Sequence, residues 1–372
     1  MSSIVKISNL DESNETLKFT LSNINVSYVN SMRRILLTNI PCIVFKTQPY
    51  NENNVEIIVN KTRLNNELIK QRISSIPIHV DDLENFQVDN YIVELQKTND
   101  TNNIIYATSE DLKIKNIKLN SYLETSEVRQ IFPPDPITGD YIDIVRLRPK
   151  LSESIEGESI QFVAKLAIST AQEDGVFNVV STCAYGNTLD AVKIKEVWQE
   201  KELSLKEKYS EKDIEFMKKD WLLLDAKRIF IEDSFDFIIE TIGIYSNFKL
   251  MELACSLLIK KLYDTLESLK NDDSLIGDAP DTMENSYIIT LKNEDYTVGK
   301  ILEYCLFSKY FEDKKELKYI GFLKKHPHDN FSIIKITYNE INSKDDIILM
   351  IEECVNLSVI LINSIRTYFV NN

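Results

Sequence analysis

The stretch FTLSNINVSYVNSMRRILLTNIPCIVF (residues 19–45) joins a strand pattern directly to a helix pattern. Apolar residues alternate with polar ones over residues 15–24, which predicts a strand. Ser27 is a candidate N-cap, and apolar residues then recur at helical spacing until Pro41 stops the element. A strand, a polar turn and an amphipathic helix are therefore expected here.

The same pattern returns near the C-terminus. Residues 20–27 read TLSNINVS and residues 290–297 read TLKNEDYT, at a constant offset of 270. The helices that follow keep register, and each copy ends in a long apolar helix, at 248–269 and 346–369. Two such units can bury their apolar faces against each other. The residues expected in this core between the halves are Met32, Leu36, Leu258, Leu262, Leu302, Leu306 and Ile360.

Composition between and around the copies indicates the domain organisation. Strand candidates rich in β-branched residues fill the middle, and a dense charge run at 191–224 predicts one or two solvated helices that Trp198 and Trp221 anchor to the body. Acidic residues with Gly277 and Pro280 favour a linker. The expected fold class is α+β. A first domain of residues 1–46 plus 226–270 would be interrupted by a mostly-β inserted domain, 47–225, and joined through a linker, 271–285, to a second domain, 286–372.

Several function classes are disfavoured by what the chain lacks. It has 8 Gly and 3 His among 372 residues, and no two glycines are close enough to form a phosphate-cradling Gly-rich loop. The five cysteines are widely dispersed, which favours buried reduced thiols over a metal or disulfide framework. The net charge of −15 disfavours wrapping nucleic acid. The N-terminus has no signal-peptide pattern, and the longest uncharged apolar run, Val355 to Ile365, is too short to span a bilayer.

Several segments resemble the alpha-type subunits of multisubunit DNA-directed RNA polymerases. Residues 19–45 resemble the start of the larger alpha-like subunit, with its Asn-Ser-x-Arg-Arg helix, and NKTRLNNELIKQRISSIPIHV (60–80) resembles its next block. RIFIEDSFDFIIETIGIY (228–245) is similar to the strand and turn before its last helix. Beyond the acidic segment, 291–307 and 319–336 resemble the small alpha-like subunit.

The resemblance implies a fold and a role. The fold is an alpha-type dimerisation domain interrupted by an insertion and fused to a second such domain, so that one chain forms an intramolecular pseudo-dimer. The order of the two parts resembles the fused subunit of large cytoplasmic DNA viruses, which implies an intracellular location in host cytoplasm and virion. The role is non-catalytic: one copy, without a homodimer, would hold the largest and second-largest polymerase subunits and small polymerase subunits. No metal or other cofactor is expected, because the inserted region holds only Cys183.

The resemblance also suggests which residues meet partners. Arg33 and Arg34 are adjacent on the first helix, so both cannot point into the core; with Asn30 they are candidates for binding partner carboxylates, the alternative being two solvated arginines. Glu67 and Arg72 are candidates on the second helix, again against a solvated face. His326 and His328 flank Pro327 without further ligands nearby, so a structural turn is favoured over a metal site.

Two other function classes stay open. An acidic adaptor in another multiprotein complex would keep the paired halves but not the polymerase partners. An enzyme is disfavoured, because no nucleophile, metal or paired-carboxylate pattern is evident.

Overall fold

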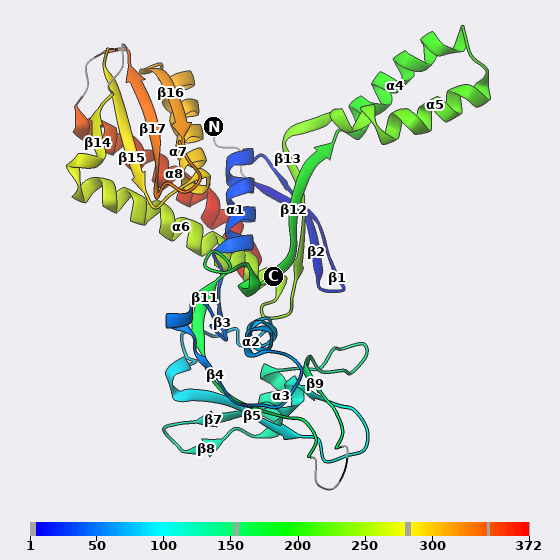
Figure 1. The fold of residues 1–372 in the computed structure, drawn as a ribbon. Helices are drawn as coiled ribbons and strands as arrows, with labels where there is room; N and C mark the ends of the chain where they lie inside the picture. The colour runs from blue at the N-terminus through cyan, green and yellow to red at the C-terminus, as the bar shows by residue number, and fades with distance from the viewer. Residues whose placement is uncertain (1–4, 151, 153–155, 280–283, 341–342, 372) are drawn as a thin grey trace. The chain divides into compact units, whose positions relative to one another are not determined.

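The computed structural model describes residues 5–150, 152, 156–279, 284–340 and 343–371. It contains two compact units (Figure 1). Unit 1 comprises Met1–Ile35, Thr182–Glu240 and Met251–Asn372, and unit 2 comprises Leu36–Ser181 and Thr241–Leu250. The charged segment 191–224 therefore groups with unit 1, whereas its sequence predicts a place in the inserted domain.

The first half of unit 1 is a four-stranded sheet with two helices. Its strand order is β1-β2-β13-β12, and the elements are β1 (Lys6–Ser13), β2 (Thr16–Ser22), α1 (Val26–Thr38), β12 (Val180–Leu189), β13 (Phe230–Thr241) and α6 (Asn247–Asn271). The predicted strand at 15–24 is β2, which lies between β1 and β13. Strand β1 has no apolar alternation in its sequence, because most of its side chains are exposed.

The second half of unit 1 repeats this plan. Its strand order is β14-β15-β17-β16, and its elements are β14 (Ile276–Asp278), β15 (Ser286–Lys292), α7 (Tyr296–Leu306), the π-helical turn η7 (Phe307–Asp313), β16 (Leu317–Leu323), β17 (Phe331–Tyr338) and α8 (Lys344–Asn371). When the four strands of each half are numbered along the chain, the first lies beside the second and the second lies beside the fourth in both sheets. The two sheets thus share one topology.

The predicted linker at 271–285 is wrong in its first part. After α6 ends at Asn271, a short turn at Asp273–Leu275 leads into β14, which pairs antiparallel with β15. Leu275 and Ile276 are buried, at 4% and 1% exposure, so their apolar side chains anchor this segment to the second half despite the surrounding acids. Residues 280–283 lie outside the described part of the chain.

The repeat is exact at the turn before each helix. Asn23 and Asn293 both have positive φ, 62° and 55°, a conformation that asparagine adopts more readily than most residues. Asn25 Oδ1 accepts a hydrogen bond from the Ser27 amide at 2.9 Å, and Asp295 Oδ1 accepts one from the Thr297 amide at 2.9 Å. The helix cap is therefore Asn25, not the predicted Ser27, since the hydroxyl residue already lies within the first turn.

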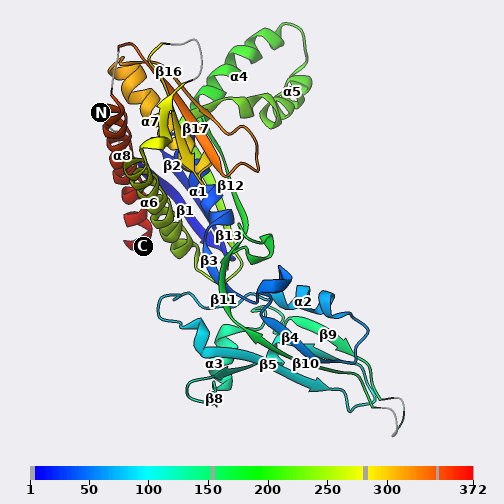
Figure 2. The same ribbon diagram turned by 60° about the vertical axis from the view of Figure 1, so that its left-hand side comes forward.

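Helices α6 and α8 lie side by side in both views (Figure 2). α8 buries one continuous stripe, which includes Ile351, Cys354, Val355, Ser358 and Ile362. By length and composition α8 is apolar enough to cross a bilayer, but 44% of its most apolar window is buried inside the molecule. A core helix of a soluble protein meets the same criterion, so this helix alone does not identify a membrane protein.

The charged segment forms a helical hairpin, here called the arm: α4 (Ala191–Lys206) and α5 (Glu211–Leu223). Ser210 caps α5 by accepting from the Asp213 amide. The Trp198 and Trp221 rings pack on each other, 5.3 Å between centroids, in a small core of the arm itself. The expectation that they anchor the helices to the body is wrong, because each fills the space between α4 and α5.

Unit 2 is mostly β. Its largest sheet has the order β4-β10-β5-β7-β8, formed by β4 (Val55–Asn60), β10 (Ser159–Lys165), β5 (Tyr91–Thr98), β7 (Lys113–Asn116) and β8 (Ser121–Tyr122). Two further pairs are β6 (Ile105–Thr108) with β9 (Asp143–Leu147), and β3 (Pro41–Val44) with β11 (Ala167–Thr170). Helix α3 spans Thr125–Ile131. Helix α2 (Asn66–Ser74) begins where the Asn65 side chain caps it by accepting from the Leu68 amide.

Candidate partner interface

Helix α1 meets the start of α7 through buried and half-buried polar groups. Ser31 Oγ donates to the Thr297 carbonyl at 2.6 Å, and Arg34 Nε donates to Thr297 Oγ1 at 2.9 Å. The Arg34 guanidinium also forms an ion pair with the Asp295 carboxylate. Asp295 is half-buried, and although desolvation opposes it, hydrogen bonds from Thr297 and the charge of Arg34 lower its pKa. The carboxylate that caps α7 therefore also binds α1.

A second polar cluster lies deeper between the same helices. The Tyr28 hydroxyl lies 3.0 Å from both Cys305 Sγ and Ser358 Oγ, and Ser358 in turn donates to the Cys354 carbonyl. Burial is the main cause that raises the pKa of Tyr28 well above its ordinary value, so the phenol stays protonated. This cluster joins α1 of the first half to α7 and α8 of the second.

Helix α6 contacts the second half through ion pairs. Lys261 Nζ lies 2.8 Å from Glu294, Lys270 Nζ lies 2.8 Å from Glu352, and Arg366 lies 3.8 Å from Glu252. Since Lys270 and Glu252 are at opposite ends of α6, these pairs fix α6 and α8 antiparallel. Glu294 is mostly buried, and desolvation raises its pKa.

Six of the seven residues predicted for the core between the halves are buried. Each is at most 1% exposed: Met32, Leu36, Leu258, Leu262, Leu302 and Leu306. Ile360 is 68% exposed, so its assignment to the core is wrong. It follows the buried Ser358 by two residues, which turns it about 200° away from the buried stripe of α8.

The two arginines of α1 have different environments. Arg33 is half-buried, and its Nε and one terminal nitrogen both donate to Asn30 Oδ1 at 3.1 Å. Arg34 is occupied by Asp295 and Thr297 within the chain. The expected partner role of Arg34 is therefore replaced by an internal one, and Asn30 with Arg33 remains as a candidate partner surface.

The predicted residues of α2 share an exposed face. Glu67, Gln71 and Arg72 are exposed, and Leu68 beside them is 47% exposed. Leu68, Gln71 and Arg72 border a hollow of about 580 Å³ in unit 2. Arg72 also donates to the Asp143 carbonyl at 2.7 Å, which fixes its side chain against β9. Glu67 and Arg72 therefore remain accessible as candidate partner residues.

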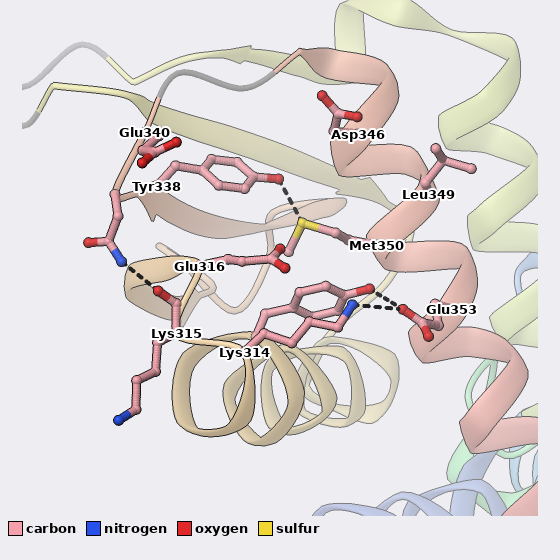
Figure 3. Close-up of a pocket in the computed structure, with 11 residues that line it drawn as sticks. Lys314, Lys315, Glu316, Tyr338, Glu340, Asp346, Leu349, Met350 and Glu353 are labelled. Atoms are coloured by element: carbon pink, nitrogen blue, oxygen red, sulfur yellow. Dashed lines mark hydrogen bonds and ion pairs between the residues drawn. The ribbon is translucent and has the colours of Figure 1, made fainter.

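A larger hollow, about 620 Å³, lies between η7, the end of β17 and α8 (Figure 3). Glu353 in its lining binds Lys309, Lys314 and the Tyr310 hydroxyl. Hydrogen bonds from Lys309 and Tyr310 lower the pKa of Glu353 to about 2. An ionised carboxylate with three partners is not suited to proton transfer near neutral pH.

The cysteines are buried as predicted, and His326 and His328 lie together in a turn. All five cysteines are free and buried, and burial raises the pKa of Cys42 to about 11. The His326 and His328 rings lie 4.9 Å apart in the β16–β17 turn. Over the described ranges of the chain, no group of three or more His, Cys, Asp or Glu side chains is arranged to hold a metal ion.

Comparison with known proteins identifies the family. The profile described as the RNA polymerase Rpb3/Rpb11 dimerisation domain matches residues 18–262. The chain belongs to this Rpb3/Rpb11 family. The match includes α1, all of unit 2 and most of α6, and it ends before the second half begins.

Individual proteins that match the chain are only distantly similar to it. DNA-directed RNA polymerase subunit Rpo3 of Pyrococcus furiosus is 21% identical over 220 residues, which cover 53% of this chain and 82% of Rpo3. Rpo3 of Pyrococcus horikoshii is 28% identical over 114 residues, 30% of this chain and 40% of that protein. A conjugation stage-specific protein of Tetrahymena thermophila is 32% identical over 111 residues, 26% of this chain and 33% of that protein.

Sequence reasoning missed the polar residues between the halves. Tyr28, Ser31, Asp295, Thr297 and Ser358 were not assigned to this contact. The offset of 270 is a signal that points to Asp295. This residue is the equivalent of Asn25 in the first copy, and a charged carboxylate at that position can both cap the helix and bind an arginine.

Proposed function

We propose that this chain is a non-catalytic assembly subunit of a DNA-dependent RNA polymerase, in which the two halves of unit 1 act as a tethered pair of alpha-like domains. The observation that carries the proposal is the contact of α1 with α7, through Arg34, Asp295 and Thr297, in a chain of the Rpb3/Rpb11 family. Subunits of this family are named for dimerisation. A chain that contains both members of a pair needs no second copy.

The proposed partners are the largest and second-largest polymerase subunits together with small polymerase subunits. Two surfaces are candidates for them: the half-buried Asn30 and Arg33 on α1, and the exposed face of α2 that contains Glu67, Leu68 and Arg72. A viral origin of the fusion, with assembly in host cytoplasm and packaging in the virion, completes the proposal. It is motivated by the order of the large-type and small-type segments in the sequence.

Native mass spectrometry of complexes purified through a tagged chain tests the assignment. We expect the two largest polymerase subunits and one copy of this chain. Two copies would contradict the tethered pair, and an absence of polymerase subunits would favour an adaptor of another complex. Replacing Arg33 by Glu should reduce recovery of polymerase subunits, whereas the exposed Arg228→Glu, 85% exposed at its side chain, serves as the control.

Co-expression of residues 1–271 and 272–372 as separate chains tests the pairing itself. The cut falls between α6 and the turn before β14, so both sheets stay whole. The two fragments should purify together through the α1–α7 and α6–α8 contacts. Recovery of each fragment alone, both folded, would contradict a core between the halves.

A further inference from the structure

Four of the nine arginines of the chain line one hollow in unit 2. Arg63, Arg72, Arg146 and Arg148 surround a space of about 250 Å³. Leu64 and the ring of Tyr106, which is 45% exposed, contribute apolar surface to the same hollow. We call this site the arginine hollow.

The positive charge of the arginine hollow is only partly compensated. Its lining contains two acids, Asp143 and Glu158. Glu158 is buried, at 7% exposure, and accepts from Arg148 Nε at 2.6 Å, so this pair is internally matched. Over the part of the chain that the structure describes, neither Arg63 nor Arg146 forms an ion pair. Arg63 nonetheless acts on Glu158 at longer range: burial opposes ionisation of that carboxyl, but the contacts with Arg148 and the charge of Arg63 lower its pKa. Four guanidinium groups against two carboxylates leave two positive charges facing the hollow.

The surroundings restrict what anion fits. Unit 2, residues 36–181 and 241–250, contains 15 Lys and Arg against 21 Asp and Glu. A nucleic acid needs a stripe of positive charge along its backbone, and here the positive charge is confined to one hollow of an acidic unit. A ligand with a few oxyanion groups at one point fits better. The guanidinium fork matches a planar carboxylate with two parallel hydrogen bonds.

The neighbouring surface favours a protein as the source of the carboxylates. The arginine hollow shares Leu64 and Arg72 with the hollow of about 580 Å³ that borders Leu68 and Gln71 on α2. A segment that lies across both would place apolar side chains on Leu64 and Leu68, and acidic side chains on the arginines. The partner segment must therefore be negatively charged where it meets the arginines and apolar where it meets the α2 face.

We propose that the arginine hollow binds carboxylate side chains of an acidic segment of a partner protein, with Arg63 and Arg146 as the principal ligands. Arg72 donates to the Asp143 backbone carbonyl and Arg148 pairs with the Glu158 carboxylate, so both line the sides of the site. That the partner is a polymerase subunit rests on the proposed function; the carboxylate site itself does not.

Arginine-specific modification with phenylglyoxal, read by mass spectrometry, tests the site in the free chain and in the purified complex. In the complex, modification of Arg63 and Arg146 should fall by roughly tenfold relative to the free chain, as expected for charged groups with bound partners. The exposed Arg129 on α3 of the same unit is the internal control. Equal modification of Arg63 and Arg146 in both samples overturns the proposal, whereas polymerase subunits in the complex would still support the proposed function.

Protection experiments on the free chain distinguish a carboxylate ligand from a phosphate or nucleic-acid ligand. A short synthetic peptide of alternating Glu and Leu should protect Arg63 and Arg146, and its Gln counterpart should not. Protection by inorganic pyrophosphate or by a single-stranded oligonucleotide, without protection by the Glu peptide, overturns the carboxylate assignment. The double variant Arg63→Gln with Arg146→Gln should weaken peptide binding roughly tenfold or more. The control Lys118→Gln with Arg129→Gln removes the same charge from the same unit and should leave binding unchanged; an equal loss in both variants contradicts a defined site.

Discussion

Helices α1 and α7 occupy the same place in the two halves of unit 1, yet they present different chemistry. Both follow an asparagine with positive φ, and both begin with an Asx side chain that caps the first turn. Helix α1 contacts the other half with the polar groups of Tyr28, Ser31 and Arg34 as well as with its apolar face, whereas α7 has more apolar residues at the equivalent positions. The pairs at an offset of 270 are Tyr28 and Val298, Ser31 and Ile301, and Arg34 and Tyr304.

This difference shows that the two halves are complementary rather than self-complementary. Arg34 of the first half meets Asp295 and Thr297 of the second. The first half has Asn25 and Ser27 at the equivalent positions, so a pair of two first halves would offer Arg34 no carboxylate. A symmetric dimer uses one surface twice, whereas here each surface carries what the other lacks. The specificity of pairing therefore resides in a few polar groups around an apolar core.

The largest expected effect comes from a charge placed in that core. Leu302 on α7 is 0% exposed, so Leu302→Asp would bury an unpaired carboxylate and should lower the free energy of unfolding by roughly 4 kcal/mol or more. Ile360→Asp is the matched control on α8, and its effect should stay within about 0.5 kcal/mol because the side chain is 68% exposed. Urea unfolding followed by circular dichroism measures both. A similar loss for both variants would mean that the α8 face around Ile360 is covered.

The next effect concerns the polar complementarity. A double-mutant cycle on Arg34→Ala and Asp295→Ala should give a coupling energy of about 1 kcal/mol, since both side chains are about one-third exposed and solvent weakens the pair. Asp295→Ala alone should cost more than Arg34→Ala, because Asp295 also caps α7. Lys300 and Glu303 provide a control pair within α7 itself. Additive effects at Arg34 and Asp295 would show that the apolar core alone specifies the pairing.

The sequence predicts the repeat and its elements well, because their signals are local. Strand alternation, Pro41 and the helical spacing of apolar residues locate β2 and α1 within a few residues. The errors are at positions that long-range packing decides. β1 carries too few apolar residues to be recognised, and Leu275 and Ile276 turn an acidic stretch into part of a sheet. Trp198 and Trp221 are correctly expected to be buried, but only the folded hairpin shows that they bury each other.

The candidate partner interface shows the same contrast between local sequence signals and long-range packing. The pattern Asn-Ser-x-Arg-Arg marks Arg33 and Arg34 together, because adjacent residues on a helix look equivalent in sequence. Their partners come from residues at very different sequence separations, Asn30 three positions away and Asp295 on the other half. The arginine hollow is likewise invisible in sequence, since Arg63 and Arg146 reach it from a loop and from β9.

The halves also differ at the connection between their last two strands, and this gives a smaller, local effect. The first half carries the arm there, whereas the second half has a short turn around His326.

Both tryptophans of the chain lie in the arm, so tryptophan fluorescence reports on the arm alone. We expect its red shift at a lower urea concentration than the loss of circular dichroism, because the arm has its own small core. Phe216→Ala, at an outward-facing residue that is 74% exposed, should leave both transitions unchanged; coincident transitions in the wild type would show that the arm and the sheets unfold together.

The smallest effect concerns η7, which extends α7 only in the second half. Lys309, Tyr310 and Lys314 bind Glu353 of α8 and lower its pKa from 4.5 to about 2. Because the folded pKa is lower than the unfolded one, this carboxylate stabilises the fold above about pH 4.5, and the stabilisation is lost as the pH falls toward 2. Glu353→Gln should therefore be less stable than the wild type by under about 1 kcal/mol at neutral pH, given that the side chain is 45% exposed. The difference should vanish near pH 2, and unfolding in urea at several pH values measures it. Glu215→Gln, whose carboxylate pairs with Lys219 on the exposed face of α5, is the control. A constant difference between wild type and Glu353→Gln across the pH range would mean that Glu353 acts through packing and not through its charge.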